Sequence, residues 1–394
     1  MPNPGRRGCA LVFAAALAAL QCACAQQLSP RVHEVPRLLA EARAEGLPAD
    51  DPLALSDDIK ASVAKHVRAS GSARERIRLL EDYLESRVRF EYASNRTLTA
   101  TEAWRAGRGD CMAFTNLFVA LARHVGLNAY FVHVREVQDY YERSGRFFVS
   151  SHVAVGFGSG PDARVIDFSR ELSAWRDMSD WRLAAYKTIR DVEAVALYYS
   201  NTAVDRMLAG ASDDAERLFR FWLGRAPTVA ELHNNLGVLL NRQRRFDESL
   251  SLLEGALRDF PTFKPLYTNA IVAARGGGQL ARAQELVRRG EALEQDDPFF
   301  RVVHGLTLYQ MEDYRGAVRE LERARSDRPE SVAILAWLTR AHYRAGQSSR
   351  GAETFAAVQR LAPRSPIVQQ LVSEFPHLAR RGDGNPEPRE SERK

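Results

Sequence analysis

Cysteine is scarce in this sequence, and its placement excludes a disulfide-stapled fold. Three of the four cysteines, Cys9, Cys22 and Cys24, lie within the first 25 residues, and only Cys111 follows them. If those 25 residues are removed, the mature chain has no second thiol with which to form an internal disulfide. An unpaired thiol in an oxidising compartment is a liability unless it is buried or used, so Cys111 is a residue of interest.

Other features are missing as well. The net charge of +5 is spread over single arginines interleaved with acidic residues, and no basic run with aromatics occurs, so nucleic-acid binding is not indicated. No metal-ligand spacing and no glycine-rich phosphate loop is present, so we expect neither a metal nor a cofactor. We expect no transmembrane segment in the mature chain, because a membrane-spanning helix needs about 20 apolar residues.

The first 25 residues have the pattern of a secretory signal peptide. Two arginines precede an apolar stretch at residues 9–20, and residues 23–25 (ACA) form an A-x-A cleavage site. This predicts an exported, periplasmic protein. The alternative is a lipoprotein anchored through Cys22 or Cys24, but neither cysteine follows the Leu-x-(Ala or Gly) sequence that usually precedes a lipidated one.

Cys111 stands at the start of a predicted helix. Gly126 marks the end of this helix. The unpaired N–H groups and the positive dipole end of a helix N-terminus stabilise a thiolate, so Cys111 is a candidate nucleophile. The alternative is a small buried hydrophobic residue. The apolar stripe of the helix consists of Phe114, Leu117, Phe118, Leu121 and Val125.

The sequence around this helix predicts an α+β domain over residues 56–170. Ser56 and Ser72 each precede a helical pattern, and a short strand is expected at residues 88–92. Residues 26–55 contain four prolines around a short helical patch and are expected to form a loosely packed lead-in. Three segments that alternate with a period of two predict an antiparallel sheet packed on the cysteine helix, at residues 128–137, 146–157 and 163–168.

The last two of these strands carry a histidine and an aspartate. If residues 158–161 (GSGP) form a symmetric hairpin loop, His152 stands directly opposite Asp167. Cys111 as nucleophile, His152 as base and Asp167 as orienting group would form a triad for acyl transfer. The alternative for His152 is a half-buried strand histidine bonded to a neighbour. A one-residue slip in register would turn Asp167 to the other face of the sheet.

Two other histidines are weaker candidates for the base. His124 lies near the far end of the cysteine helix, about 20 Å from Cys111. His133 lies on the adjoining strand and has no acidic partner two or three positions away on its own face.

Residues 107–134 (GRGDCMAFTNLFVALARHVGLNAYFVHV), followed by SSHVAV and VIDF, resemble the transglutaminase-like superfamily. This resemblance covers about residues 56–170. It implies a papain-like fold with a triad in the order Cys111, His152, Asp167. It also implies activity as a peptidase, an amide-cleaving enzyme or a transamidating crosslinker, although some members of the superfamily have lost activity.

The second half of the chain is periodic. Pro227, Pro261, Pro329 and Pro363 fit one 34-residue grid, and Gly237 and Gly305 lie two periods apart. This spacing is typical of tetratricopeptide repeats (TPR), which stack helix pairs into a solenoid with a concave face. The grid predicts ten helices in five repeats, at residues 196–229, 230–263, 264–297, 298–331 and 332–365.

Three segments outside the regular pattern carry further expectations. Residues 171–195, with Trp175, Trp181 and Tyr186, are expected to connect the two domains. In the third repeat, residues 276–278 (GGG) replace the usual turn, so a local kink is expected. Residues 366–394 are expected to be mostly disordered, because residues 380–394 are polar and have no apolar stripe.

These observations predict an α+β papain-like, transglutaminase-like domain followed by an all-α TPR solenoid. The predicted function is an exported cysteine protease or amidase, or a transamidase, whose repeats recruit a protein partner or substrate. The alternative is a catalytically inactive scaffold for protein–protein interaction. For the repeats themselves the alternative is a rigid spacer with an empty groove, and peptide or protein binding is the favoured interpretation.

Overall fold

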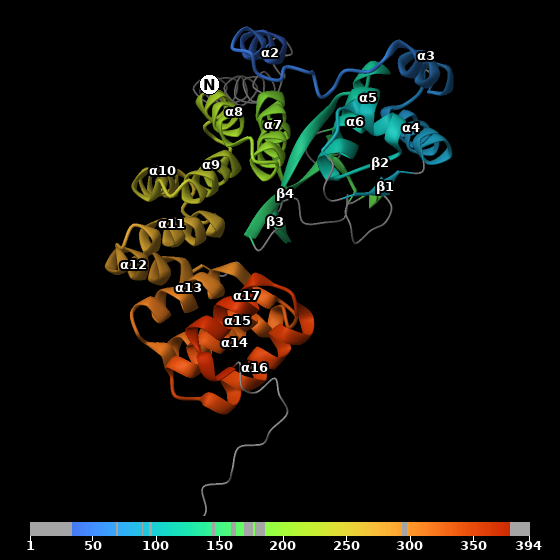
Figure 1. The fold of residues 1–394 in the computed structure, drawn as a ribbon. Coiled ribbons are helices and arrows are strands. Elements are labelled where there is room, and N and C mark those ends of the chain that lie inside the picture. Colours follow the sequence, from blue (N-terminus) through green and yellow to red (C-terminus); the bar gives the residue numbers. More distant parts are fainter. Residues whose placement is uncertain are drawn as a thin grey trace, which may run out of the picture. The chain divides into compact units, whose positions relative to one another are not determined.

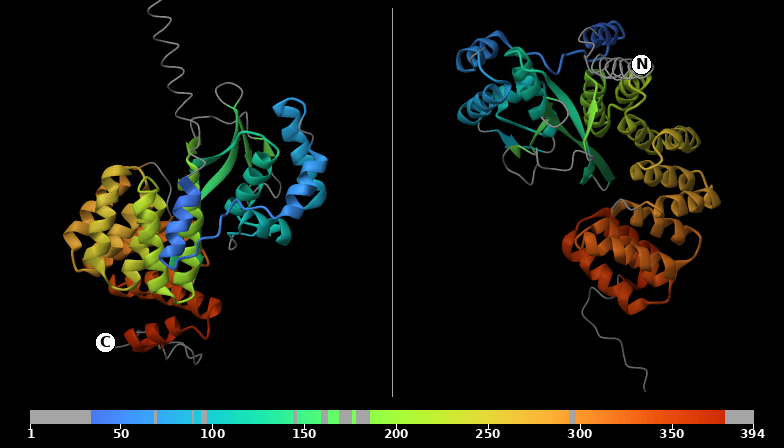
Figure 2. Two further views of the ribbon diagram at one scale, coloured as in Figure 1. Left: turned by 90° about the horizontal axis from the view of Figure 1, so that it is seen from above. Right: turned by 180° about the vertical axis from the view of Figure 1, so that it is seen from behind.

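The computed structural model describes most of the chain after residue 33. The described residues are 34–67, 70–88, 90–93, 97–143, 146–158, 163–168, 176–177, 186–293 and 298–378. The chain divides into two compact units, residues 1–139 with 151–232 and residues 140–150 with 233–394 (Figures 1 and 2). The expected signal peptide lies outside the described residues. Among the residues described, no helix has the length and apolar character needed to cross a membrane.

The first described helix is α2 (Glu34–Ala44), and it corrects the expectation of a loosely packed lead-in. Its apolar side chains recur at helical spacing and are buried. Arg225, the last residue of α8 (Ser212–Arg225), forms ion pairs with Glu41 at 3.1 Å and Glu45 at 3.3 Å. Part of the proline-containing segment is therefore a packed helix, because its apolar stripe finds a partner surface.

Two of the helices that precede the cysteine helix begin directly after a serine. In α4 (Ala73–Arg87) the Ser72 hydroxyl accepts a hydrogen bond from Glu75 N at 3.2 Å, as the sequence predicts for a cap. Ser56 precedes α3 (Asp57–His66), but its side chain makes no capping bond. Within the described part of the strand expected at residues 88–92, β1 (Glu91–Tyr92) forms, and it pairs in parallel with β2 (Arg108–Gly109).

A five-stranded sheet has the order β6-β5-β4-β3-β7. Its first three strands along the chain confirm the predicted ones: β3 (Ala129–Arg143), β4 (Arg146–Phe157) and β5 (Arg164–Asp167). The sheet then continues beyond the expected domain end at residue 170.

Two further strands lie within the segment expected to be a connector. They are β6 (Arg176–Asp177), paired with β5, and β7 (Tyr186–Ile189), paired with β3. Tyr186 therefore belongs to the sheet. Trp175 and Trp181 lie outside the described residues. The sequence missed these strands because they are short and interrupted by polar residues.

The repeat helices follow the predicted 34-residue grid. Their first members start at residues 230, 264, 298 and 332, in steps of one period. This arrangement is typical of a TPR solenoid. The helices are α7 (Asp191–Leu208), α8, α9 (Ala230–Arg242), α10 (Phe246–Asp259), α11 (Lys264–Gly276), α12 (Leu280–Glu291), α13 (Pro298–Gln310), α14 (Tyr314–Asp327), α15 (Val332–Arg344) and α16 (Ser348–Leu361).

The turn within each repeat contains a residue with positive φ, again at 34-residue spacing. Gly278 has φ +75°, and the equivalent Arg244 and Glu312 adopt φ 61° and 64° although they carry side chains. The expectation that residues 276–278 replace the usual turn is therefore wrong. Gly278 occupies the same left-handed position as the other repeats use, and glycine adopts it without steric cost.

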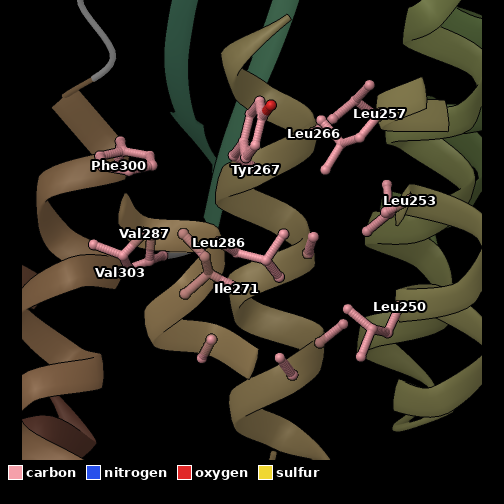
Figure 3. Packing of buried hydrophobic residues seen from close by; sticks show 14 of the residues in the cluster. Leu250, Leu253, Leu257, Leu266, Tyr267, Ile271, Leu286, Val287, Phe300 and Val303 are labelled. Atoms are coloured by element: carbon pink, nitrogen blue, oxygen red, sulfur yellow. The ribbon is translucent and has the colours of Figure 1, made fainter. Parts of the chain in front are cut away.

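The repeat core explains the small residues of the sequence pattern. A Cβ atom on Gly237 would lie 2.6 Å from Leu253 Cδ2, and one on Gly305 would lie 2.8 Å from Leu321 Cγ. Only glycine lets the paired helices approach this closely. The core around the third repeat interlocks large apolar side chains from four helices (Figure 3), among them Leu250, Leu253, Leu257, Leu266, Tyr267, Ile271, Leu286, Val287, Phe300 and Val303.

One more helix, α17 (Pro366–Glu374), follows the last repeat and corrects the expectation of a disordered tail in this part. Ser365 caps it, and Leu371 is fully buried. Arg340 of α15 binds both carboxylate oxygens of Glu374 at 2.7 and 2.8 Å. Terminal repeats need such a cover for their apolar end face. Residues 379–394 lie outside the described residues.

Candidate active site

Cys111 is the first residue of α6 (Cys111–His124), as the sequence predicts. Asp110 is the N-cap, and its Oδ1 accepts a hydrogen bond from Ala113 N at 2.8 Å. Gly107 ends the preceding α5 (Ala100–Ala106) in the left-handed conformation, which turns the chain into β2 and then into α6. Cys111 is buried, with 5% of its surface exposed, and forms no disulfide among the described residues.

Contacts along α6 hold it against the sheet. Thr115, one turn after Cys111 and on the same helix face, donates its hydroxyl hydrogen to the Val153 carbonyl oxygen at 3.2 Å. Phe114 stacks on Phe168 with ring centroids 4.6 Å apart. Because Val153 follows His152 directly, these contacts bring the start of α6 to the strand that carries the histidine.

His152 and Asp167 meet, but not as direct opposites. The β4–β5 ladder pairs Phe157 with Arg164, whereas a symmetric four-residue loop would pair it with residue 162, so the expected register is wrong. This register shifts the pairing by two residues and makes His152 and Asp167 diagonal neighbours. A two-residue shift keeps both side chains on one face, and diagonal neighbours remain within reach of long side chains.

The histidine lies between an acid and the thiol. His152 Nε2 is hydrogen-bonded to Asp167 Oδ1, and both side chains are buried. His152 is also hydrogen-bonded to Cys111. Burial lowers the pKa of His152, but hydrogen bonds to Asp167 and Cys111 and their negative charges outweigh it and raise the pKa to about 10. The imidazolium form is therefore stabilised.

The other two histidines are placed elsewhere. His124 is the last residue of α6, at the end opposite Cys111. His133 has an acidic partner, because its Nε2 lies 3.1 Å from Glu231 Oε1 on α9. Sequence spacing could not reveal this partner, since the two residues are 98 positions apart.

Asp110 is a site residue that the sequence reading did not single out. It is 8% exposed, and the Thr97 hydroxyl donates a hydrogen bond to its Oδ2. Burial raises the pKa of Asp110 to about 6, although the bonds from Thr97 and Ala113 oppose that rise. The sequence feature that could have identified Asp110 is its position directly before Cys111, where the N-cap of the helix is expected. Within the described residues, no group of three or more His, Cys, Asp and Glu side chains could hold a metal ion.

The fold and the site together define a class. A buried cysteine begins a helix, and a histidine–aspartate pair approaches it from two neighbouring strands, as in papain-like proteins, and a helical repeat follows. Residues 60–162 match the model of the transglutaminase-like superfamily, and residues 203–262 and 308–375 match models of the tetratricopeptide repeat. The chain thus combines a region similar to the transglutaminase-like core with a region of tetratricopeptide repeats. The first match includes Cys111 and His152 and ends before Asp167.

Several solved structures are similar to part of the chain. A TPR protein of Thermus thermophilus is 16% identical over 47% of this chain and 98% of that chain, with a TM-score of 0.40. PilW, described as a type IV pilus biogenesis factor, is 24% identical over 45% and 82%, with a TM-score of 0.40. PilF of Pseudomonas aeruginosa is 20% identical over 45% and 82%, with a TM-score of 0.39. The comparison with curated proteins gave no significant match.

Proposed function

We propose that this protein is an exported, cysteine-dependent acyl-transfer enzyme, a protease or amidase, whose repeats recruit a protein partner or substrate. The observation that carries the proposal is the position of His152, buried between the Asp167 carboxylate and the Cys111 thiol. A stabilised imidazolium beside a thiol at a helix N-terminus favours the thiolate–imidazolium pair that nucleophilic cysteine chemistry requires.

The reaction follows from this geometry. The Cys111 thiolate attacks the amide carbonyl carbon, and the positive end of the α6 dipole stabilises the oxyanion that forms. His152 then donates its proton to the leaving amine as the C–N bond breaks, and a thioester remains. Neutral His152 next takes a proton from water, which attacks the thioester and frees Cys111. Asp167 keeps the ring oriented in both steps. An amine in place of water would make the protein a crosslinker.

Export and partner binding are supported by separate parts of the chain. The arginines, apolar stretch and A-x-A sequence at the N-terminus support a periplasmic location. The helical repeats support protein binding, because stacked repeats provide an extended surface.

The test is the rate of Cys111 alkylation by iodoacetamide between pH 5 and 9 in the mature protein. An ordinary thiol is almost entirely protonated at pH 6, so rapid reaction there reports the ion pair. We expect His152→Ala to lower the rate at pH 6 by at least about tenfold. His133→Ala is the matched control, since it removes another histidine that is paired with a carboxylate, and we expect it to have no effect. Equal rates in wild type and His152→Ala would refute the proposal.

The alternative, a catalytically inactive scaffold, is favoured by the burial of Cys111, of which 5% is exposed. On that alternative the thiol hardly reacts at any pH below 8 in the wild type, and Cys111→Ser leaves binding to a protein partner unchanged.

A further inference from the structure

The first helix of the repeat array directs a polar stripe at the start of the cysteine helix. Tyr198, Asn201 and Asp205 recur along α7 at spacings of three and four, so they share one face. Asp205 and Tyr198 both interact electrostatically with Asp110, and Asn201 reaches it through one intermediary. These residues belong to the same compact unit as Cys111.

A chain of hydrogen bonds leads from α7 to the residue before Cys111. Asn201 Nδ2 donates to Thr97 Oγ1 at 3.0 Å, and Thr97 Oγ1 donates its hydrogen to Asp110 Oδ2. The other carboxylate oxygen of Asp110 accepts from Ala113 N. A hydroxyl that accepts from an amide becomes a better donor, so Asn201 strengthens the bond that Thr97 makes to Asp110.

The charges around Asp110 explain why the hydrogen bonds from Asn201 through Thr97 affect this carboxylate. Asp110 is buried, and Asp205 adds negative charge from α7, so both raise the pKa of Asp110. These influences disfavour a carboxylate at position 110, and the bonds from Thr97 and Ala113 stabilise it. An ionised cap with both oxygens bonded has one orientation, and Cys111 follows it directly in the chain.

The far end of α6 is attached to the same helix. Arg123 donates to both oxygens of Asp191, the first residue of α7, at 2.7 and 2.8 Å. Two separate polar connections therefore fix α6 against α7, one at each end.

We propose that Asn201 is a positioning residue for Cys111 and acts through Thr97 and Asp110, so that the first repeat helix is part of the cysteine site. This inference rests on the proposed function, because it gives these hydrogen bonds a role in presenting the Cys111 thiol to His152. A change in the position of α7, such as a partner on the repeats could cause, would then alter the reactivity of Cys111.

Two readouts on the full-length mature protein test this inference. The first is the carboxyl ¹³C NMR titration of Asp110, assigned through its loss in Asp110→Asn. The second is the alkylation rate of Cys111 at pH 6. Thr97→Val keeps the side-chain shape but removes the hydroxyl, and we expect it to raise the pKa of Asp110 and to slow alkylation about tenfold. Asn201→Ala is expected to change both in the same direction by less.

Two matched variants separate positioning from stability. Thr97→Ser keeps the hydroxyl, so we expect both readouts to stay at the wild-type values. Asp191→Asn weakens the attachment at the far end of α6, about 20 Å from Cys111, so we expect a lower melting temperature with both readouts unchanged.

The possible failures are distinguishable. If alkylation depends on His152 but not on Thr97 or Asn201, this inference alone is overturned. The same holds if Asp191→Asn slows alkylation as much as Asn201→Ala does, because the effect is then one of general stability. If wild-type alkylation does not depend on His152, the proposed function fails and this inference fails with it.

Discussion

The hydrogen bond between His152 and Asp167 determines how the histidine titrates, and Asp167→Asn tests this directly. Asparagine keeps the shape of the side chain but removes its charge. A hydrogen bond to a charged group contributes about 1.5–3 kcal/mol, which corresponds to roughly 1–2 pKa units at 1.36 kcal/mol per unit. We therefore expect the pKa of His152 to fall from about 10 by roughly 1–2 units in this variant.

The same shift predicts how stability depends on pH. Because the pKa of folded His152 is raised above its ordinary value of 6.5, the protonated ring stabilises the fold. This contribution is complete below pH 6.5 and is lost as the pH rises toward 10. In Asp167→Asn the pKa of His152 is lower, so the stabilisation by its protonated ring should be lost completely at a lower pH. Urea unfolding at pH 6, 8 and 9.5 measures the difference.

Imidazole ¹⁵N NMR of histidine-labelled protein measures the pKa itself. Glu231→Gln is the matched control, because it removes the carboxylate from the other histidine pair, His133 and Glu231. We expect it to leave His152 unchanged. An unchanged titration of His152 in Asp167→Asn would show that the hydrogen bond does not cause the raised pKa, and the reasoning would be wrong.

Two further predictions concern the repeats. Arg244→Gly and Glu312→Gly remove side chains from left-handed turn positions, and each is expected to raise the free energy of unfolding by about 1 kcal/mol. Gly278→Ala at the equivalent position is expected to lower it by about the same amount. If Arg244→Gly and Glu312→Gly both lower the free energy of unfolding, the side chains at these positions are not strained. Leu371→Ala on α17 is expected to lower the free energy of unfolding by about 2–4 kcal/mol, because Leu371 is fully buried against the last repeat. The exposed Gln369→Ala is its control, and equal melting temperatures for the two variants would show that α17 does not cover the repeat core.

The repeat half of the fold could be predicted almost completely. A helix with a 3.6-residue apolar stripe and a repeat with a 34-residue period are local patterns, since each repeat packs mainly on its neighbours. One error, the turn expected at residues 276–278, lay within a repeat. Two others fell where this reasoning does not apply. Helix α17 comes after the last period, and α2 comes before the first. Each is stabilised by packing against a surface that its own sequence does not contain.

The sequence indicated that His152 and Asp167 would meet, but it gave neither their register nor the role of Asp110. Cys111 at a helix start follows from the local pattern, and so do the strands that carry His152 and Asp167. The register predicted for those two strands was wrong because the prediction assumed a symmetric four-residue loop between them. The two side chains still meet, because the error was an even number of residues and strand side chains alternate with a period of two.

The sequence by itself determined the helix that begins at Cys111, the strands that follow it and the ten repeat helices, because periodicity and capping act over a few residues. Only the tertiary structure decided which polar groups meet. Asn201 is 104 positions from Thr97, and Glu231 is 98 from His133. Hydrogen bonds between such distant residues form only after packing has brought their elements together, and no local pattern in the chain specifies them.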